Sequence, residues 1–94
     1  MTRDELRAKA NELPLLPGVY LMMDRVGQVI YVGKAKKLKN RVSQYFQDTS
    51  SHNEKTRMMV AHVDRFDTII VRSEFEALVL ENSLIKRHQP RYNI

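Results

Sequence analysis

The sequence predicts a fold of the α/β class, of the α+β type, with a small three-stranded antiparallel sheet and helices packed around it. Two β-forming segments, 19–23 and 28–32, flank the turn-forming residues 24–27 and predict a hairpin. A third β-forming segment, 66–71, follows two stretches of helical periodicity. A sheet of only three strands needs helices on a face to be stable, so helices are expected to cover it.

Length and composition fit one domain over residues 1–94, with an N-terminal helix, 1–13, ahead of a core, 17–94. The 43% apolar and 29% charged content is typical of a soluble globular protein. The absence of cysteine excludes disulfides and thiolate metal sites and favours a cytoplasmic location. No apolar run approaches the ~20 residues of a membrane span, and the N-terminus lacks a signal peptide's apolar segment, so no membrane contact is expected.

The balance of charge points to an anionic partner. Sixteen Lys and Arg against eleven Asp and Glu leave a net charge of +5. An excess of this size favours nucleic acid ahead of a membrane surface. A protein that is basic without such a partner is the alternative reading of the charge alone.

The first helix and the hairpin can be placed from local signals. Thr2 and Glu5 have the spacing of a capping box, which starts a helix, and Pro14 ends it. If residues 24–27 form the whole loop, Tyr20 lies opposite Tyr31 and both share one face. A loop of three or five residues would separate them. The face expected to line the core then carries Val19, Leu21, Met23, Ile30 and Val32, and the other carries Tyr20, Met22, Val29 and Tyr31.

Three helices are expected beyond the hairpin. Residues 35–46 have helical periodicity, and two further capping boxes, Ser51 with Glu54 and Ser73 with Glu76, open the others. The last helix is expected to run to about Arg87, before Pro90. The side chains predicted to be buried in the first two of these helices are Leu38, Val42, Tyr45, Phe46, Met58, Met59, Val60 and Val63.

One carboxylate lies on the apolar stripe of the last helix. Glu81 comes three residues after Leu78 and four before Ile85. A buried carboxylate is costly unless it is paired or binds a cation. Glu81 is therefore either a stripe-edge residue that reaches water or a lysine, or a ligand for a hard divalent cation.

A run of five cations without an acidic residue follows the hairpin. It starts directly after Gly33, a residue that lets backbone approach a ligand closely, which favours a phosphate-contacting edge over a merely solvated helix face. Arg41 suits a bidentate grip on a phosphate, and Lys34 acts as a point charge. The tyrosines could instead only cover a half-exposed sheet face. The expected DNA-binding residues are Lys34, Lys36, Lys37, Lys39 and Arg41.

These residues together resemble the GIY-YIG nuclease superfamily, and most closely the N-terminal endonuclease domains of the UvrC family. The resemblance extends from Leu13 to Ile94, with Val19 and Val32 in place of the isoleucines of the superfamily name. Any one motif is weak, but all of them in this order and spacing are strong. The motifs are Pro17-Gly18-Val19-Tyr20, Ile30-Tyr31-Val32-Gly33-Lys34-Ala35, Leu38-Lys39-Asn40-Arg41-Val42 with Tyr45, Glu76-Ala77-Leu78-Val79-Leu80-Glu81, Leu84-Ile85-Lys86 and Pro90-Arg91-Tyr92-Asn93-Ile94.

The resemblance implies a DNA endonuclease that depends on a single Mg²⁺ or Mn²⁺. Glu81 would be the metal ligand, Tyr31 the general base and Tyr20 its water- or phosphate-orienting partner. Lys34 and Arg41 would stabilise the scissile phosphate, and Tyr45 and Asn93 would be further members of the site. The family's N-terminal half cuts damaged double-stranded DNA 3′ to a lesion in nucleotide excision repair. A UvrB-type helicase would be the partner, through parts of a longer protein from which this domain is expected to be excised.

These roles agree with the chemistry of the residues. A tyrosine with a pKa near 10 is a poor base at neutral pH, and Lys34 and a metal are expected to favour its phenolate. Tyr31, Lys34 and Glu81 are therefore expected to converge. Two alternatives remain: a stand-alone homing or restriction-type nuclease of the same superfamily, and a non-catalytic nucleic-acid-binding module with strongly salt-dependent binding.

Overall fold

The structure, a computed structural model, describes residues 1–47 and 49–94. Its three strands form one sheet in the order β2-β1-β3, and both neighbouring pairs are antiparallel. The predicted fold class is confirmed. The strands are β1 (Gly18–Met23), β2 (Val29–Ala35) and β3 (Arg65–Ile70); the helices are α1 (Arg3–Asn11), α2 (Leu38–Tyr45), α3 (Glu54–His62) and α4 (Glu74–His88), with a 3-10 turn η1 (Thr49–Ser51).

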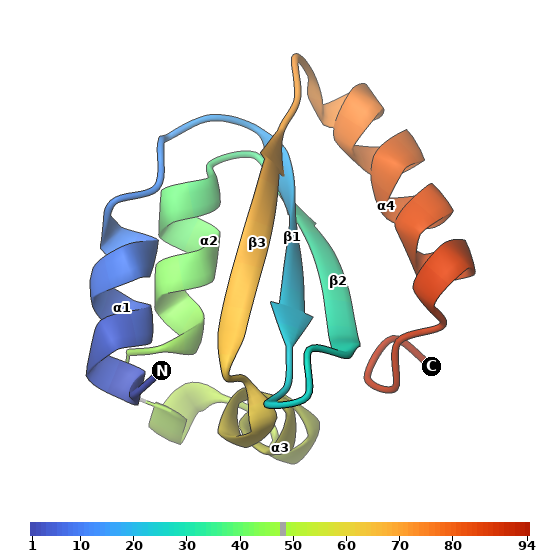
Figure 1. Ribbon diagram of the computed structural model, residues 1–94. Coiled ribbons are helices and arrows are strands. Elements are labelled where there is room, and N and C mark those ends of the chain that lie inside the picture. The colour runs from blue at the N-terminus through green and yellow to red at the C-terminus, as the bar shows by residue number, and fades with distance from the viewer. Residues whose placement is uncertain (48) are drawn as a thin grey trace.

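Helices cover both faces of the sheet. Figure 1 shows α1 and α2 against one face, α4 alone against the other, and α3 across the end where β1 turns into β2. Every residue of the central strand β1 is buried, which is the expected result of covering both faces. Among the described residues, no helix is long and apolar enough to cross a membrane.

Two hydrophobic clusters fill these layers, whereas the sequence had indicated one core face. The tyrosine face is itself a core face: Tyr20 is 1% exposed and packs with residues of α1, α2 and α3. The opposite cluster lies under α4 and contains Val19, Leu21, Val32, Val71 and Ala77.

The hairpin register differs from the prediction. Tyr20 pairs with Gly33, and Met22 pairs with Tyr31, so the two tyrosines are diagonal neighbours. A bulge next to Met22 and Met23 then shifts the pairing. As a result Ile30 lies in the tyrosine-side cluster and Val29 packs against the α4-side cluster, the reverse of the prediction.

The helix after the hairpin begins later than predicted. β2 continues through Ala35, and α2 starts only at Leu38 with no side-chain cap from Lys37. The connector before β1 replaces that cap, because Leu38 N donates to Leu16 O at 2.9 Å and Lys39 N donates to Pro14 O at 3.2 Å.

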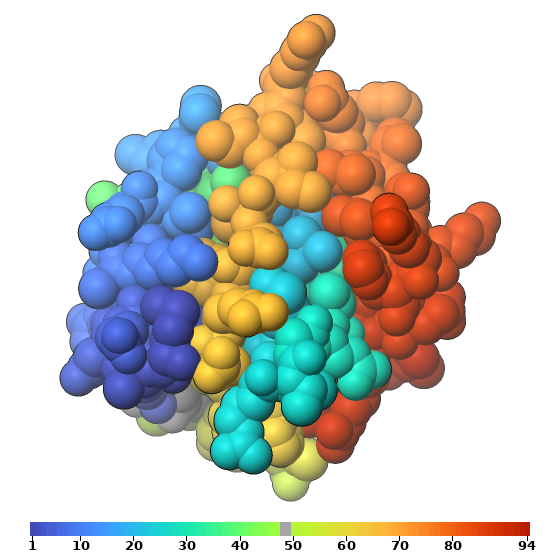
Figure 2. All heavy atoms as spheres, viewed as in Figure 1, coloured from blue at the N-terminus to red at the C-terminus, as the bar shows by residue number. Residues whose placement is uncertain are grey.

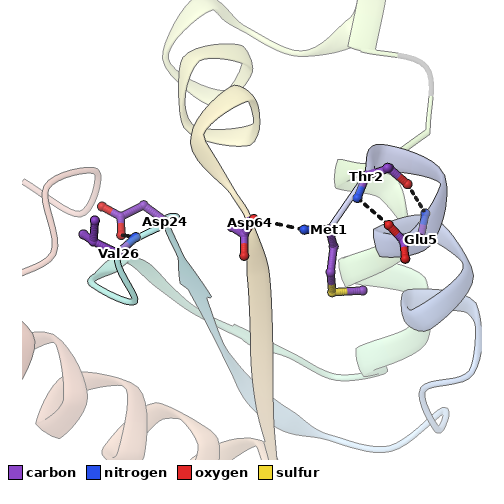
Figure 3. A network of polar contacts seen from close by, with 6 residues as sticks. All are labelled: Met1, Thr2, Glu5, Asp24, Val26 and Asp64. Atoms are coloured by element: carbon purple, nitrogen blue, oxygen red, sulfur yellow. Dashed lines mark hydrogen bonds and ion pairs between the residues drawn. The ribbon is translucent and has the colours of Figure 1, made fainter.

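The other helix starts depend on side-chain caps. The Thr2–Glu5 capping box is confirmed, and the amino group of Met1 pairs with Asp64 at 2.9 Å beside it (Figure 3). Ser73 caps α4 as predicted. The Ser51–Glu54 box is wrong, because Asn53 is the N-cap of α3 and accepts from Thr56 N at 2.8 Å. Of the two methionines predicted to be buried in this helix, Met59 is buried and Met58 is 49% exposed.

The helix α4 covers only part of its face of the sheet. The helix packs over β2 and β1. In Figure 2 the atoms of β3 reach the surface between the N-terminal helix and α4. The sheet-facing stripe of α4 therefore lies over β2, the edge strand that carries Tyr31 and Lys34.

Candidate active site

Three tyrosines from three elements form one cluster on the α2 side of the sheet. The ring centroids of Tyr20 and Tyr45 are 5.7 Å apart, those of Tyr20 and Tyr31 are 6.2 Å apart, and those of Tyr31 and Tyr45 are 6.5 Å apart. The hydroxyls of Tyr20 and Tyr45 share a hydrogen bond of 2.7 Å. The strand β2 thus brings Tyr31 beside a pair of tyrosines that are already hydrogen-bonded.

Gly33 makes room for this cluster. Tyr20 is its cross-strand partner, and a Cβ at position 33 would overlap the outer end of the Tyr20 ring. The glycine of the Tyr31-Val32-Gly33 motif is therefore required by packing, since the Tyr20 side chain lies across it.

Replacing Gly33 with alanine is expected to destabilise the fold by about 1–3 kcal/mol, because a well-packed aromatic ring would have to move. Thermal or urea unfolding of the Gly33→Ala chain measures this cost. Shortening the obstructing side chain should relieve it, so Gly33→Ala should cost less in a Tyr20→Leu background. Equal costs in both backgrounds would contradict the overlap.

Arg41 is the cation of the tyrosine cluster. Its guanidinium lies 5.7 Å from the centre of the Tyr45 ring. Hydrogen bonding to Tyr20 is the main effect that raises the pKa of Arg41. Burial, followed by the proximity of Tyr45, raises the pKa of Tyr20. Tyr20 is therefore a neutral, buried hydroxyl that orients its neighbours.

Tyr31 is the more accessible of the two hairpin tyrosines. Burial is the largest effect that raises its pKa, to about 12, followed by Tyr45. Arg41 lowers this pKa, and Glu81 raises it. The sequence had predicted that Lys34 would favour the phenolate; in the structure Arg41 has this effect, and burial outweighs it.

Glu81 projects from the sheet-facing stripe of α4. The residues four before and three after it, Ala77 and Leu84, belong to or pack against the α4-side cluster. Glu81 itself is half-buried, and its carboxylate has no hydrogen bond or ion pair within residues 1–47 and 49–94. Its effect on the pKa of Tyr31 places its charge near that phenol. Pairing with a lysine, one of the alternatives that the sequence left open, is thus not observed among the described residues.

The five cationic side chains of the basic run do not all point the same way. Lys34, Lys36, Lys37 and Arg41 line one cavity of about 430 Å³, in which Lys36 also pairs with Glu74 at 3.5 Å. Lys39 does not line it, because positions 39 and 41 are ~200° apart around a helix. Strand alternation points Lys34 toward the α4 side and Tyr31 toward the α2 side. The candidate site therefore lies around the edge of β2.

Asn93 holds that edge. Its side-chain Nδ2 donates to Val32 O at 2.9 Å, and its Oδ1 accepts from Val32 N at 2.8 Å. Tyr92 N donates to Ile30 O at 2.9 Å. The C-terminal segment thus replaces a fourth strand along part of β2, and Asn93 positions the strand that bears Tyr31.

A second cavity, of about 500 Å³, includes residues that the sequence did not single out for function. It adjoins the first through Arg41 and Gln44. The sequence marked Ser51 only as a possible helix start, and no local signal marked the others. The added residues are Gln44, Ser51, His52, Asn53, Lys55 and Thr56, and they meet Tyr31, Arg41, Tyr45 and Asn93 in its walls.

A single carboxylate, clustered tyrosines and an arginine around the edge of a small antiparallel sheet define a nuclease domain of the GIY-YIG class. The sequence profile of the UvrC-like GIY-YIG domain matches residues 16–94. The chain therefore belongs to the UvrC-like GIY-YIG domain family, as the resemblance had indicated.

Individual relatives agree with this membership. UvrABC system protein C of Clostridium kluyveri is 62% identical over 82 residues, which are 87% of this chain and 13% of that protein. The magnesium-bound N-terminal endonuclease domain of UvrC from Thermotoga maritima superimposes with a TM-score of 0.87 at 38% identity, over 100% of both chains. A tyrosine-to-phenylalanine variant of that domain is also bound to its catalytic divalent cation, at 37% identity, a TM-score of 0.87 and full coverage of both chains.

The relatives are much longer than this chain. The chain spans between 13% and 15% of the length of the curated relatives it matches.

Proposed function

We propose that this domain is a divalent-metal-dependent DNA endonuclease that makes the incision 3′ to a lesion in bacterial nucleotide excision repair. The observation that carries the proposal is the half-buried Glu81 carboxylate, which has no partner within residues 1–47 and 49–94 and lies on the helix that packs over β2, the strand of Tyr31. The substrate would be damaged duplex DNA in the cytoplasm. A UvrB-type helicase would contact parts of a longer protein, since the relatives extend far beyond this domain.

The residues present fit one Mg²⁺ or Mn²⁺ ion. The described residues contain no group of three or more histidines and carboxylates that could hold a metal ion by themselves. Magnesium commonly uses one or two carboxylates and keeps several waters, so a lone half-buried glutamate suits it. The tyrosine-to-phenylalanine variant of the similar Thermotoga maritima domain is still bound to its cation. This supports a carboxylate over a phenol as the metal ligand.

Held by Glu81, the cation would supply positive charge to the reacting phosphate and would offset the effect of Glu81 on the pKa of Tyr31. Arg41 binds and orients the phosphate with its guanidinium fork. Lys34 adds positive charge from the α4 side. The phenolate form of Tyr31 takes the proton of the attacking water and becomes the neutral phenol. The hydrogen-bonded Tyr20 and Tyr45 fix the Tyr31 ring and the Arg41 side chain in place.

Manganese binding to the 94-residue chain tests the metal site independently of cleavage. We expect paramagnetic Mn²⁺ to broaden the amide NMR signals of Tyr31 and Glu81 before others, and Glu81→Gln to remove this selectivity. Glu76→Gln is the matched control, because it removes the same charge from an exposed position of α4. Unchanged broadening in Glu81→Gln would contradict the assignment and favour a non-catalytic DNA-binding module.

A further inference from the structure

We propose a second phosphate-binding subsite at the N-terminal end of α3, which holds a DNA backbone phosphate next to the scissile one. The inference rests on the proposed function. It adds a subsite at residues to which the sequence assigned no catalytic, metal-binding or DNA-binding role. The subsite lies in the cavity of about 500 Å³, whose lining also includes Tyr31 and Arg41. One strand can therefore occupy both places without leaving the cavity.

The walls of this cavity favour an anion. None of the described residues that line it, which exclude residue 48, is acidic, and Arg41 and Lys55 contribute two cations. Lys55 Nζ donates to Ile94 O at 3.1 Å, which holds the ammonium at the cavity and leaves its other hydrogens free to bind. A phosphate placed in this cavity would meet two positively charged side chains.

The start of α3 adds backbone donors. The helix has nine residues, and Asn53, Lys55 and Thr56 of its first turn line the cavity. Asn53 caps Thr56 N, while the N–H groups of Glu54 and Lys55 have no acceptor among the described residues. Free N–H groups at a helix start bind phosphate, and the helix dipole supports the charge.

A buried hydroxyl in the same wall independently indicates a ligand. Tyr92 is 8% exposed, and its hydroxyl has no hydrogen-bond partner within residues 1–47 and 49–94. His52 Nε2 donates to Gln44 O at 3.2 Å. The buried Nδ1 of His52 has no hydrogen-bond partner among the described residues. A hydrated phosphate satisfies both groups, because its oxygens accept from Tyr92 and its water donates to Nδ1.

Lys55→Ala tests the subsite, with Arg57→Ala as the matched control. Arg57 lies on the same helix with the same charge, but it lines a different cavity together with Leu6 and Phe46. Binding of a labelled duplex is measured by fluorescence anisotropy in EDTA, so that neither cleavage nor the metal site contributes. We expect Lys55→Ala to raise Kd about fivefold and to reduce the slope of log Kd against log salt by ~0.9, with less than a twofold effect from Arg57→Ala.

Amide NMR of the unmodified chain locates the bound phosphate. Adding the duplex at up to millimolar concentration should shift the amides of residues 54–56, whereas inorganic phosphate at the same concentration should shift them far less. Equal effects of the two substitutions, no effect of either, no shift at 54–56, or equal shifts with inorganic phosphate would each overturn the subsite. None of these results depends on the metal, so failure here and failure of the proposed nuclease activity are distinguishable.

Discussion

Replacing Glu81 with glutamine is expected to lower the rate of DNA incision by about 10³-fold, equivalent to about 4 kcal/mol of transition-state stabilisation. The reason is that glutamine keeps the size and polarity of the side chain but removes the negative charge that would hold the cation. The fold should remain, because the Glu81 carboxylate has no hydrogen bond or ion pair within the described residues. Unfolding should therefore occur at nearly the same temperature as in the unmodified chain.

The incision assay places the domain in a longer protein, because the chain spans only 13% to 15% of the length of the curated relatives it matches. The domain is grafted in place of the matching segment of a full-length relative and tested on duplex DNA with a defined lesion. Glu76→Gln serves again as the control, and we expect it to cut at the unmodified rate. Metal-dependent 3′ incision at full rate by the Glu81→Gln protein would contradict the role of Glu81.

The shared face of the two hairpin tyrosines was predictable although their pairing was not. The sequence placed Tyr20 opposite Tyr31, whereas Tyr20 pairs with Gly33. A shift by two residues keeps the same faces, so both rings still meet Tyr45. The bulge beyond Met22 shifts the remaining pairs by one, which reverses the faces of Val29 and Ile30. A bulge depends on backbone pairing and leaves no clear mark in composition.

The start of α2 illustrates a second limit. Ala35 was assigned to the helix because residues 35–46 have helical periodicity, yet it is the last residue of β2. The N–H groups that begin α2 are satisfied by the carbonyls of Pro14 and Leu16, a contact between distant segments. Local capping signals cannot reveal such a start.

The site residues divide in the same way. Glu81 was identifiable because a carboxylate interrupts an apolar stripe, a pattern visible within one helix. His52 and Lys55 carry no such pattern, because they line the cavity together with Tyr92 and Asn93 of the distant C-terminal segment. Asn93 was identified only through the family resemblance, and its contact with Val32 depends on how the C-terminal segment folds back onto β2.

Tyr31→Phe is the second substitution with a large expected effect, a loss of incision of about 10²–10⁴-fold, typical for removal of a general base. Tyr20→Phe is the matched control. Its hydroxyl is buried and bonded to Tyr45, so its loss should disturb the cluster and reduce incision less than Tyr31→Phe does.

The pH dependence distinguishes a base from a residue that only packs. The metal-free pKa of Tyr31 is raised to about 12, so the phenol holds its proton throughout the neutral range. The incision rate of the unmodified protein should therefore rise with pH as the phenolate fraction grows, and this rise should persist in Tyr20→Phe and vanish in Tyr31→Phe. Because the pKa of Tyr31 is raised in the folded state, its phenol also contributes to the free energy of unfolding. This contribution is fully present below pH ~10 and is lost as the pH rises toward 12. Tyr31→Phe should remove that part of the alkaline destabilisation, and an unchanged rate profile in this variant would show that another group accepts the proton.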